Sequence, residues 1–302
     1  MSAQVLSRWG VIVVEGDDAV TFLQAQLSND IAGMPESQMR LAGLCTAKGR
    51  MLGSFFMLRR EKQVFLLCRN DTIEALVKRL SMFVLRSKCK VRDARSEFAL
   101  AFEGEGQQSK PMNVAWGETP LASASLRTLQ GHMPTILIQA SGDLSAASEG
   151  DEAFEYCLQQ LGISYIQKST VEMFVPQTIN FDLFGGVSFS KGCYPGQEVV
   201  ARSHYLGKVK RRAFQATMDQ NEAVNPGSDV WLEGKDNEPA GLVITQVSMN
   251  GQLHLMVELQ VEDAENPNSR FCVKGENTVL PLMINPPPYD VHQKGNQFEQ
   301  TA

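Results

Sequence analysis

Near Ala213 the sequence pattern changes to one of short strand-like runs separated by turns. This change most limits the folds that the chain can adopt. From there on, short β-branched and apolar runs alternate with turn residues: Ala213–Met218, Val230–Leu232, Leu242–Val247, Leu253–Leu259 and Leu280–Met283. Strands at this spacing are typical of a small barrel or sandwich. The proline run Pro286–Pro288 cannot continue a sheet. We therefore predict an all-β domain over residues 211–288 and a tail over residues 289–302.

The chain before residue 211 mixes strand and helix patterns. The expected strands are Val11–Val14, Ser54–Leu58, Val64–Cys68, Phe98–Phe102 and Ile136–Ile138, and the expected helices are Asp17–Leu27, Asn70–Leu80 and Asp151–Leu161. Asp71 and Glu74 have the spacing of a capping box at the start of the second helix. We predict an α+β region over residues 1–210.

Composition is that of an ordinary globular protein. The 302 residues are 43% apolar and 21% charged, which allows two or three hydrophobic cores. No apolar run approaches the roughly 20 residues needed to cross a bilayer, and no secretory signal is visible at the N-terminus. We expect a cytoplasmic protein without membrane contact, whose six cysteines are reduced thiols. None of them forms a C-x-x-C pair, so we expect no conventional protein-only metal site.

Positive charge is concentrated in two runs, although the net charge is -6. Lys191–Arg212 holds six basic residues and one acid, and Lys78–Arg95 holds seven basic residues and one acid. Local positive fields on an acidic protein favour an anionic ligand such as polyglutamate, phosphate or RNA. The alternative for each run is a solvated basic face.

Glycines are dense in the segment Gly185–Glu198, which reads G-G-V-S-F-S-K-G-C-Y-P-G-Q-E. Glycine lets a backbone approach a ligand closely or adopt a positive φ. We expect the glycines at 192 and 196 to present Lys191, Cys193 and Tyr194 on a tight, exposed turn. The next residues, 197–202, are helix-competent, so their first N–H groups are expected to face the same site.

Cys193 is the candidate reactive or ligand-donating cysteine of this turn. A thiol beside Lys191 and near a helix N-terminus has its thiolate favoured; the alternative is a small, buried packing residue. Glu198 is a candidate acid–base group or a hydrogen-bond partner for a heterocycle, with a first-turn helix carboxylate as the alternative. His204 is a candidate partner for Cys193, although a lone histidine is often inert. The residues alone therefore indicate a ligand-binding turn with a candidate thiol.

The turn K-G-C-Y-P-G-Q-E, followed by V-V-A-R, closely resembles the motif of the YgfZ-type folate-binding proteins, relatives of the glycine-cleavage T-protein, an aminomethyltransferase. The segments Gly16–Asp30, Cys45–Met51 and Phe174–Gln177 are also similar to that family, and the resemblance runs from about Trp9 to Pro288. It implies three domains in a ring around a central folate pocket, the third being a β-barrel. Residues 1–210 would then hold two interleaved subdomains, the second near residues 46–135.

The resemblance also implies a function. It implies that the chain binds tetrahydrofolate and supports iron–sulfur cluster assembly or repair, and thereby tRNA modification, with iron–sulfur enzymes and assembly factors as partners. The implied functional pair is Cys193 with Lys191. The implied folate-binding residues are Trp9, Asn29, Phe154, Gln177, Lys191, Tyr194, Gln197, Glu198 and Arg202. Trp9 and Phe154 are expected to stack on the pterin, Phe154 standing where the family commonly has tryptophan; for both, core packing is the alternative.

One departure from the transferases bears on the reaction. In a T-protein, the turn that resembles Lys48–Leu52 runs into a pair of aspartates, one of which stabilises charge on the folate. This chain has Gly53-Ser54 there. Loss of that charge partner removes electrostatic stabilisation of the charge that develops on the folate, which is large in a closed site. We therefore do not expect ordinary aminomethyl transfer.

Two other functions stay open on the sequence. One is a one-carbon transferase or demethylase with a displaced carboxylate, for which the candidates are Asp30, Asp182 and Glu198. The other is an RNA-binding module that uses the two basic runs. The chain lacks a recognised RNA motif, and aromatic residues are not interleaved with the basic ones, which counts against direct nucleic-acid binding.

Overall fold

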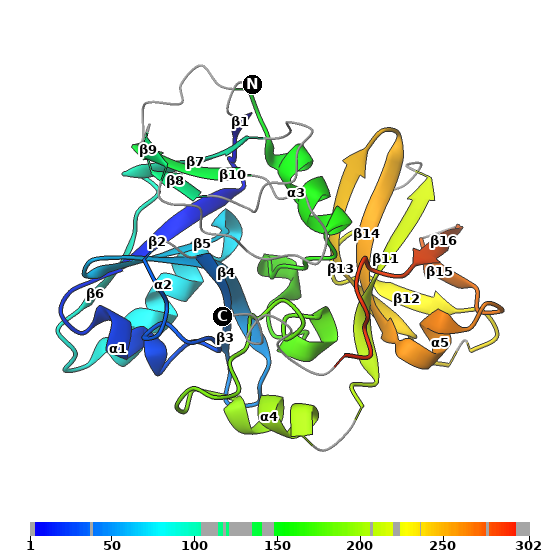
Figure 1. Cartoon of the computed structure of the whole chain (residues 1–302). Helices are drawn as coiled ribbons and strands as arrows, with labels where there is room; N and C mark the ends of the chain where they lie inside the picture. The colour runs from blue at the N-terminus through cyan, green and yellow to red at the C-terminus, as the bar shows by residue number, and fades with distance from the viewer. Residues whose placement is uncertain are drawn as a thin grey trace.

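The computed structural model contains three β-sheets, joined by a central segment that carries the glycine-rich turn (Figure 1). It describes residues 4–36, 39–103, 114–116, 119–120, 135–140, 148–205, 208–219, 224–235, 237–275 and 278–293. Two open sheets lie on one side and a closed barrel on the other, with helix α3 (Asp151–Gln160) between them. No helix within these ranges is long and apolar enough to cross a bilayer.

The first open sheet has five antiparallel strands in the order β3-β4-β5-β2-β6. Their bounds are β2 Trp9–Glu15, β3 Met39–Cys45, β4 Met51–Arg60, β5 Gln63–Arg69 and β6 Lys90–Asp93. Ile12 and Val14 of β2 pack with helices α1 (Ala19–Gln24) and α2 (Asn70–Val84), whereas Val11 and Val13 face the opposite core. Burial on both faces explains why this strand reads as a continuous apolar run.

Both helices of this sheet differ from the sequence prediction. Helix α1 is shorter than Asp17–Leu27 at both ends, beginning at Ala19 and ending at Gln24. The two aspartates before it make tertiary contacts: Asp17 pairs with Lys62, and Asp18 Oδ2 accepts from the backbone N–H of Lys88 at 2.7 Å. Helix α2 continues past Leu80 to Val84. Its N-cap is Arg69 and no side chain caps it, so the expected capping box is wrong.

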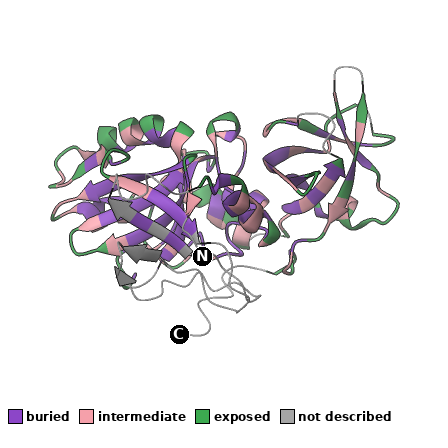
Figure 2. Cartoon of the chain, turned by 90° about the horizontal axis from the view of Figure 1, so that it is seen from above, coloured by how far each residue is buried: buried purple, intermediate pink, exposed green. Residues whose placement is uncertain are grey.

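The second open sheet has the strand order β1-β7-β10-β8-β9. Its strands are β1 Gln4–Val5, β7 Phe98–Glu103, β8 Val114–Trp116, β9 Thr119–Pro120 and β10 Thr135–Ala140. Because β1 and β2 belong to different sheets, the few residues between them join the two sheets. Phe154 and Leu158 of α3 pack into the core that the two sheets share. Figure 2 shows buried strands of the sheets in purple and exposed residues in green on the outer faces of the helices.

The C-terminal sheet is a closed barrel in the order β11-β14-β13-β12-β15-β16, as the resemblance implied. Its strands are β11 Arg211–Asp219, β12 Asp229–Leu232, β13 Gly241–Met249, β14 Gln252–Gln260, β15 Phe271–Lys274 and β16 Val279–Asn285, with helix α5 at Val261–Glu265. Strand β15 was not among the strands expected from the sequence. Strand β16 ends at Asn285, directly before the run Pro286–Pro288, although it tolerates Pro281 in its interior.

The central segment crosses from α3 to the barrel through two 3-10 helices, η1 (Lys168–Thr170) and η2 (Pro176–Ile179), and helix α4 (Gln197–Tyr205). Met51 of β4 holds it by two backbone hydrogen bonds of 2.8 Å, donating to Phe174 and accepting from Glu172. At the far end, Asn180 binds both polar backbone atoms of Ala213 in β11. The part of the central segment that precedes the glycine-rich turn is therefore anchored to both β4 and β11.

Candidate functional site

Lys191 fixes the glycine-rich turn to the end of helix α1. Its Nζ donates to the backbone carbonyl of Gln24, to that of Leu27 at 2.6 Å and to that of Asn29 at 3.1 Å. Carbonyls at a helix C-terminus lack partners within the helix, so the amine satisfies them. The expectation that Lys191 stands exposed on the turn is wrong. Burial lowers the pKa of Lys191 to about 8, and Asp30 opposes this shift by favouring the charged amine.

The residues before the turn are held by a second set of contacts. Asn29 Nδ2 donates to the carbonyls of Leu41 and Gly185, both at 2.6 Å. Ser28 Oγ donates to the carbonyl of Gly186 at 2.6 Å. A Cβ on Gly186 would lie 2.4 Å from the ring of Phe181, so a glycine is needed there. Asn29 therefore binds the turn to strand β3, and part of the glycine density serves close packing within the chain.

Tyr194 and Gly196 lie on the inner side of the turn. Tyr194 is 6% exposed and has Lys191 Nζ 5.2 Å from its ring centroid, a cation–π arrangement. Its predicted exposure is wrong, and burial raises the pKa of its hydroxyl. Gly196 has a φ of +81°, and a Cβ there would lie 2.4 Å from the carbonyl oxygen of Thr46. Gly192 needs no such explanation, because a Cβ there would meet nothing within 4 Å.

Cys193 is exposed on the outer side of the turn, four residues before helix α4 begins. This excludes the buried packing role considered for it. Glu198 and Arg202 of α4 are exposed and Gln197 is half-buried. His204 stacks on Phe189 with ring centroids 3.7 Å apart, so its partnership with Cys193 stays a prediction.

Gln177 connects the central segment to helix α4. Its Nε2 donates to the carbonyl of Val200 at 2.6 Å. The side chain is 1% exposed, and its Oε1 is a buried acceptor without a donor among the described residues.

Trp9 and Phe154 lie in the core between the open sheets. Their rings meet edge to face with centroids 5.2 Å apart, and Tyr165 packs on Trp9 at 5.0 Å. Trp9 is 4% exposed and Phe154 is fully buried, so protein atoms cover both rings here. Their stacking on a pterin stays a prediction.

A charged cluster beside Trp9 was missed by the sequence analysis. Glu155 of α3 is 3% exposed and pairs with Arg69 and, at 3.1 Å, with Arg8. The guanidinium of Arg69 lies 5.9 Å from the Trp9 ring centroid and 5.6 Å from that of Tyr165. The signal in the sequence was the i, i+4 spacing of Asp151 and Glu155, which places two acids on one helix face. Burial raises the pKa of Glu155, and the two arginines oppose this.

A hydroxyl occupies the position where a transferase is expected to carry a carboxylate. Ser54 is 5% exposed, and its Oγ accepts from the backbone N–H of Ile166 at 2.8 Å. A Cβ on Gly53 would lie 2.8 Å from Leu76. Ser54 therefore serves a structural hydrogen bond.

The three candidate displaced carboxylates do not share one environment. Asp182 forms a buried pair with Arg212, Asp30 accepts from Gln24 Nε2 at 2.8 Å, and Glu198 is exposed on α4. Asp182 is thus already neutralised by a guanidinium.

The two basic runs are only partly surface charge. In the first run, Lys191 binds backbone carbonyls, Arg211 pairs with Glu258 at 2.8 Å and Arg212 is buried. In the second run, Arg92 pairs with Glu15 at 3.0 Å and Arg95 with Asp93 at 2.5 Å. Three of the six basic residues of the first run therefore make structural contacts, which their spacing in the sequence could not reveal, and Arg202, Lys208 and Lys210 are exposed. Within the described ranges, no three His, Cys, Asp or Glu side chains come together as a candidate metal site.

Known proteins resemble this chain over nearly its whole length. No family model matches the sequence. A tRNA-modifying protein YgfZ from Klebsiella pneumoniae is 25% identical over 312 residues, covering 96% of this chain and 94% of the relative. The aminomethyltransferase T of the glycine cleavage system from Bartonella henselae has a similar fold, with a TM-score of 0.67 at 14% identity over 97% of this chain and 87% of that one.

The assignment of this chain to a family rests on a second relative. The tRNA-modifying protein YgfZ from Colwellia psychrerythraea is 30% identical over 292 residues, covering 91% of this chain and 90% of the relative. Identity at this level over both chains, together with the turn at Lys191–Glu198 and a T-protein-like fold ending in a closed barrel, leaves one conclusion. The chain belongs to the YgfZ family.

Proposed function

We propose that this chain is a cytoplasmic tetrahydrofolate-binding protein that supports iron–sulfur enzymes, among them enzymes that modify tRNA. The observation that carries the proposal is the full-length similarity to a relative named tRNA-modifying protein YgfZ. Its partners in this proposal are folate, iron–sulfur enzymes and their assembly factors.

The chemistry around Trp9 fits a pterin. Nε1 of Trp9 and Nε of Arg69 are buried donors without an acceptor among the described residues. Away from Trp9, on the central segment beside helix α4, Oε1 of Gln177 is a buried acceptor without a donor among those residues. Buried polar atoms are normally paired, and the ring heteroatoms and amide groups of folate can pair with such atoms. Bound tetrahydrofolate would supply a carrier of one-carbon units.

The proposed folate residues contribute in two ways. Stacking of Trp9 and Phe154 on the ring requires the protein atoms that cover both side chains to move aside, while Gln177, Gln197, Glu198 and Arg202 offer polar groups. Asn29, Lys191 and Tyr194 keep the turn in place, since the amide and the amine already bind backbone carbonyls and the phenol ring lies under the amine.

We infer binding rather than aminomethyl transfer because of Ser54. A hydroxyl that accepts a backbone hydrogen bond carries no charge to oppose a developing cation, and such a charge is worth several kcal/mol in a closed site. Cys193 has a different part in the proposal: its exposed thiol is within reach of a partner protein, so it acts on the client enzyme or its cluster.

Calorimetric titration with tetrahydrofolate under anaerobic conditions tests the binding. We expect binding by the wild type, a loss of at least tenfold in affinity for Trp9→Leu, and no change for Trp231→Leu in the barrel strand β12. Failure of the wild type to bind would remove folate from the proposal.

Complementation of a strain that lacks this gene tests the thiol. The readout is the abundance of tRNA nucleosides made by iron–sulfur enzymes. We expect Cys193→Ser to fail and Cys272→Ser, a half-buried barrel cysteine, to restore the nucleosides. Full restoration by Cys193→Ser would end the proposed role of the thiol.

A further inference from the structure

The end of helix α2 exposes a cluster of large apolar side chains. Met82 is 60% exposed, Phe83 38% and Leu85 86%. Seven large apolar side chains are exposed in the described part of the chain, and three of them fall within residues 82–85. Single exposed apolar residues are normal, whereas a contiguous group marks an interaction site. Together with Arg79 and Arg86 they form what we term the α2 patch.

The backbone holds Leu85 outward. Leu85 is the C-cap of α2, with a φ of 46° and a ψ of -103°. Helices commonly end on a glycine when φ is positive, because a side chain is disfavoured there. A glycine at this position would remove both the strain and the exposed apolar surface. Strained residues of this kind cluster at sites that hold a ligand or partner.

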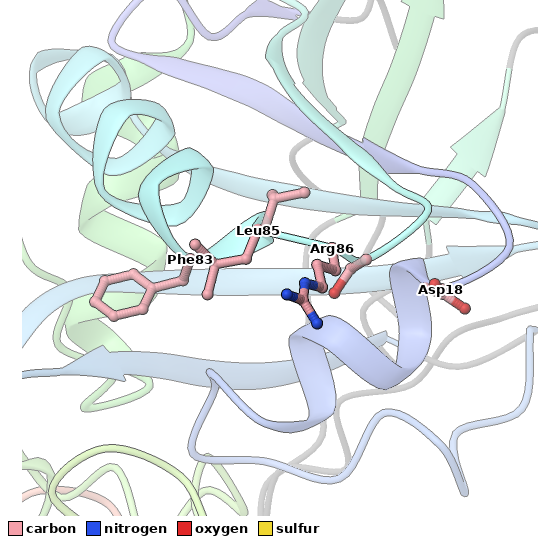
Figure 3. A pocket seen from close by; sticks show the side chains of 6 residues that line it. Asp18, Phe83, Leu85 and Arg86 are labelled. Atoms are coloured by element: carbon pink, nitrogen blue, oxygen red, sulfur yellow. The ribbon is translucent and has the colours of Figure 1, made fainter.

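The patch borders a shallow hollow. The hollow is lined by Asp18, Phe83, Val84, Leu85, Arg86 and Ser87. Figure 3 shows Phe83, Leu85 and Arg86 spreading outward from the end of α2, with Asp18 on the opposite side near the start of α1. The apolar side chains thus project away from their own core and leave room beside them.

The surroundings of the patch are basic. Residues 75–92 contain six basic side chains (Lys78, Arg79, Arg86, Lys88, Lys90 and Arg92) and no acid. The guanidinium of Arg79 lies 4.6 Å from the ring centroid of Phe83, so charge and apolar surface are presented together. Of the nearby carboxylates, Asp17 pairs with Lys62, and Glu15 pairs with Arg92 and so neutralises it. Asp18 lines the hollow itself, where its Oδ2 accepts from the backbone N–H of Lys88 at 2.7 Å.

We propose that the α2 patch is a docking surface for a protein partner whose contacting segment carries acidic and large apolar side chains. Methionine, phenylalanine and arginine are the residue types enriched at protein interfaces, whereas nucleic-acid interfaces are more polar. On a chain of net charge -6, a local basic and apolar surface selects an acidic segment and orients it.

Site-specific photocrosslinking in the full-length protein identifies the partner. A photoreactive phenylalanine analogue replaces Phe83 in one strain and Met283, a 66% exposed residue of β16, in a control strain. We expect a protein adduct at position 83 that is absent at position 283. Equal adducts at both positions, or RNA, lipid or a second copy of this chain as the main adduct at 83, would overturn the proposal.

Affinity measurements with the purified partner then test the chemistry. We expect Leu85→Asp and Arg86→Glu each to weaken binding at least tenfold, and Met283→Asp to leave it unchanged. The acidic residue of the partner that lies near the crosslinked position is then changed to lysine. This charge reversal is expected to restore the partner's binding to the Arg86→Glu variant. Leu85→Gly separates docking from folding, because it is expected to keep or raise stability while weakening binding. Unchanged affinity in all α2-patch variants would contradict the proposal.

Discussion

Arg212 and Asp182 form a two-point ion pair inside the protein, with Nη1 2.6 Å from Oδ1 and Nη2 3.2 Å from Oδ2. Both side chains are 2% exposed. Arg212 belongs to β11 and also donates to the carbonyl of Gln177 at 2.8 Å. The pair therefore joins the barrel to the central segment that carries the glycine-rich turn.

Removal of one partner of this pair is expected to destabilise the protein strongly. Arg212→Met leaves a buried carboxylate unpaired, which lowers the free energy of unfolding by about 3–5 kcal/mol. The double variant Arg212→Met/Asp182→Asn leaves no charge and is expected to be more stable than the single variant. Urea unfolding measures both, and a double variant less stable than the single one would contradict this account.

Ser54 is expected to contribute to stability through its hydroxyl. Ser54→Ala leaves the buried N–H of Ile166 without its acceptor, at a cost of about 1–3 kcal/mol. Ser81→Ala on the exposed face of α2 is the matched control, expected within about 0.5 kcal/mol of the wild type. Equal stabilities of the two variants would show that the hydroxyl has no structural role.

Lys191 is expected to make stability depend on alkaline pH. Its pKa is about 8 in the folded protein against an ordinary 10.5, so between these values the unfolded chain binds more protons and stability rises with pH. Lys191→Met lacks this contribution. Relative to the variant, the wild type gains at most about 3.5 kcal/mol of stability across that window, at about 1.4 kcal/mol per pKa unit, and solvent screening of the partly exposed amine reduces this to about 2 kcal/mol.

Unfolding free energies at a series of pH values give this difference. The exposed Lys62→Met variant is the control and is expected to follow the wild type through the window. A constant difference between wild type and Lys191→Met would mean that Lys191 stays charged throughout.

Thiol labelling of the native protein is expected to reach Cys193 first. Cys193 is exposed, whereas Cys45 and Cys68 are buried, and burial raises the pKa of each of those thiols to about 12. A chromogenic disulfide reagent should show a fast phase that Cys193→Ser abolishes and Cys272→Ser keeps. A fast phase that survives in Cys193→Ser would place the reactive thiol elsewhere.

Local patterns in the sequence predicted most of the secondary structure. The apolar run Val11–Val14 and the short runs after Ala213 became strands because side-chain spacing along a strand is a local property. The sequence did not indicate strand β15, and Asp17 and Asp18 lie outside α1, where they contact Lys62 and the backbone of Lys88, partners that local spacing does not contain.

The sequence by itself determined that the turn Lys191–Glu198 is distinctive, and it left open whether Cys193 is exposed or buried. The structure places Cys193 on the surface and gives Gly196 a φ of +81°. Only the tertiary structure decided that Lys191 and Tyr194 face inward. The reason is physical: the carbonyls that accept from Lys191 Nζ come from the end of α1, more than 160 positions earlier in the chain. No spacing within the turn encodes those acceptors. The sequence pattern therefore predicts that Lys191 and Tyr194 are exposed, whereas in the folded protein they are partly or fully buried and hold the turn in place.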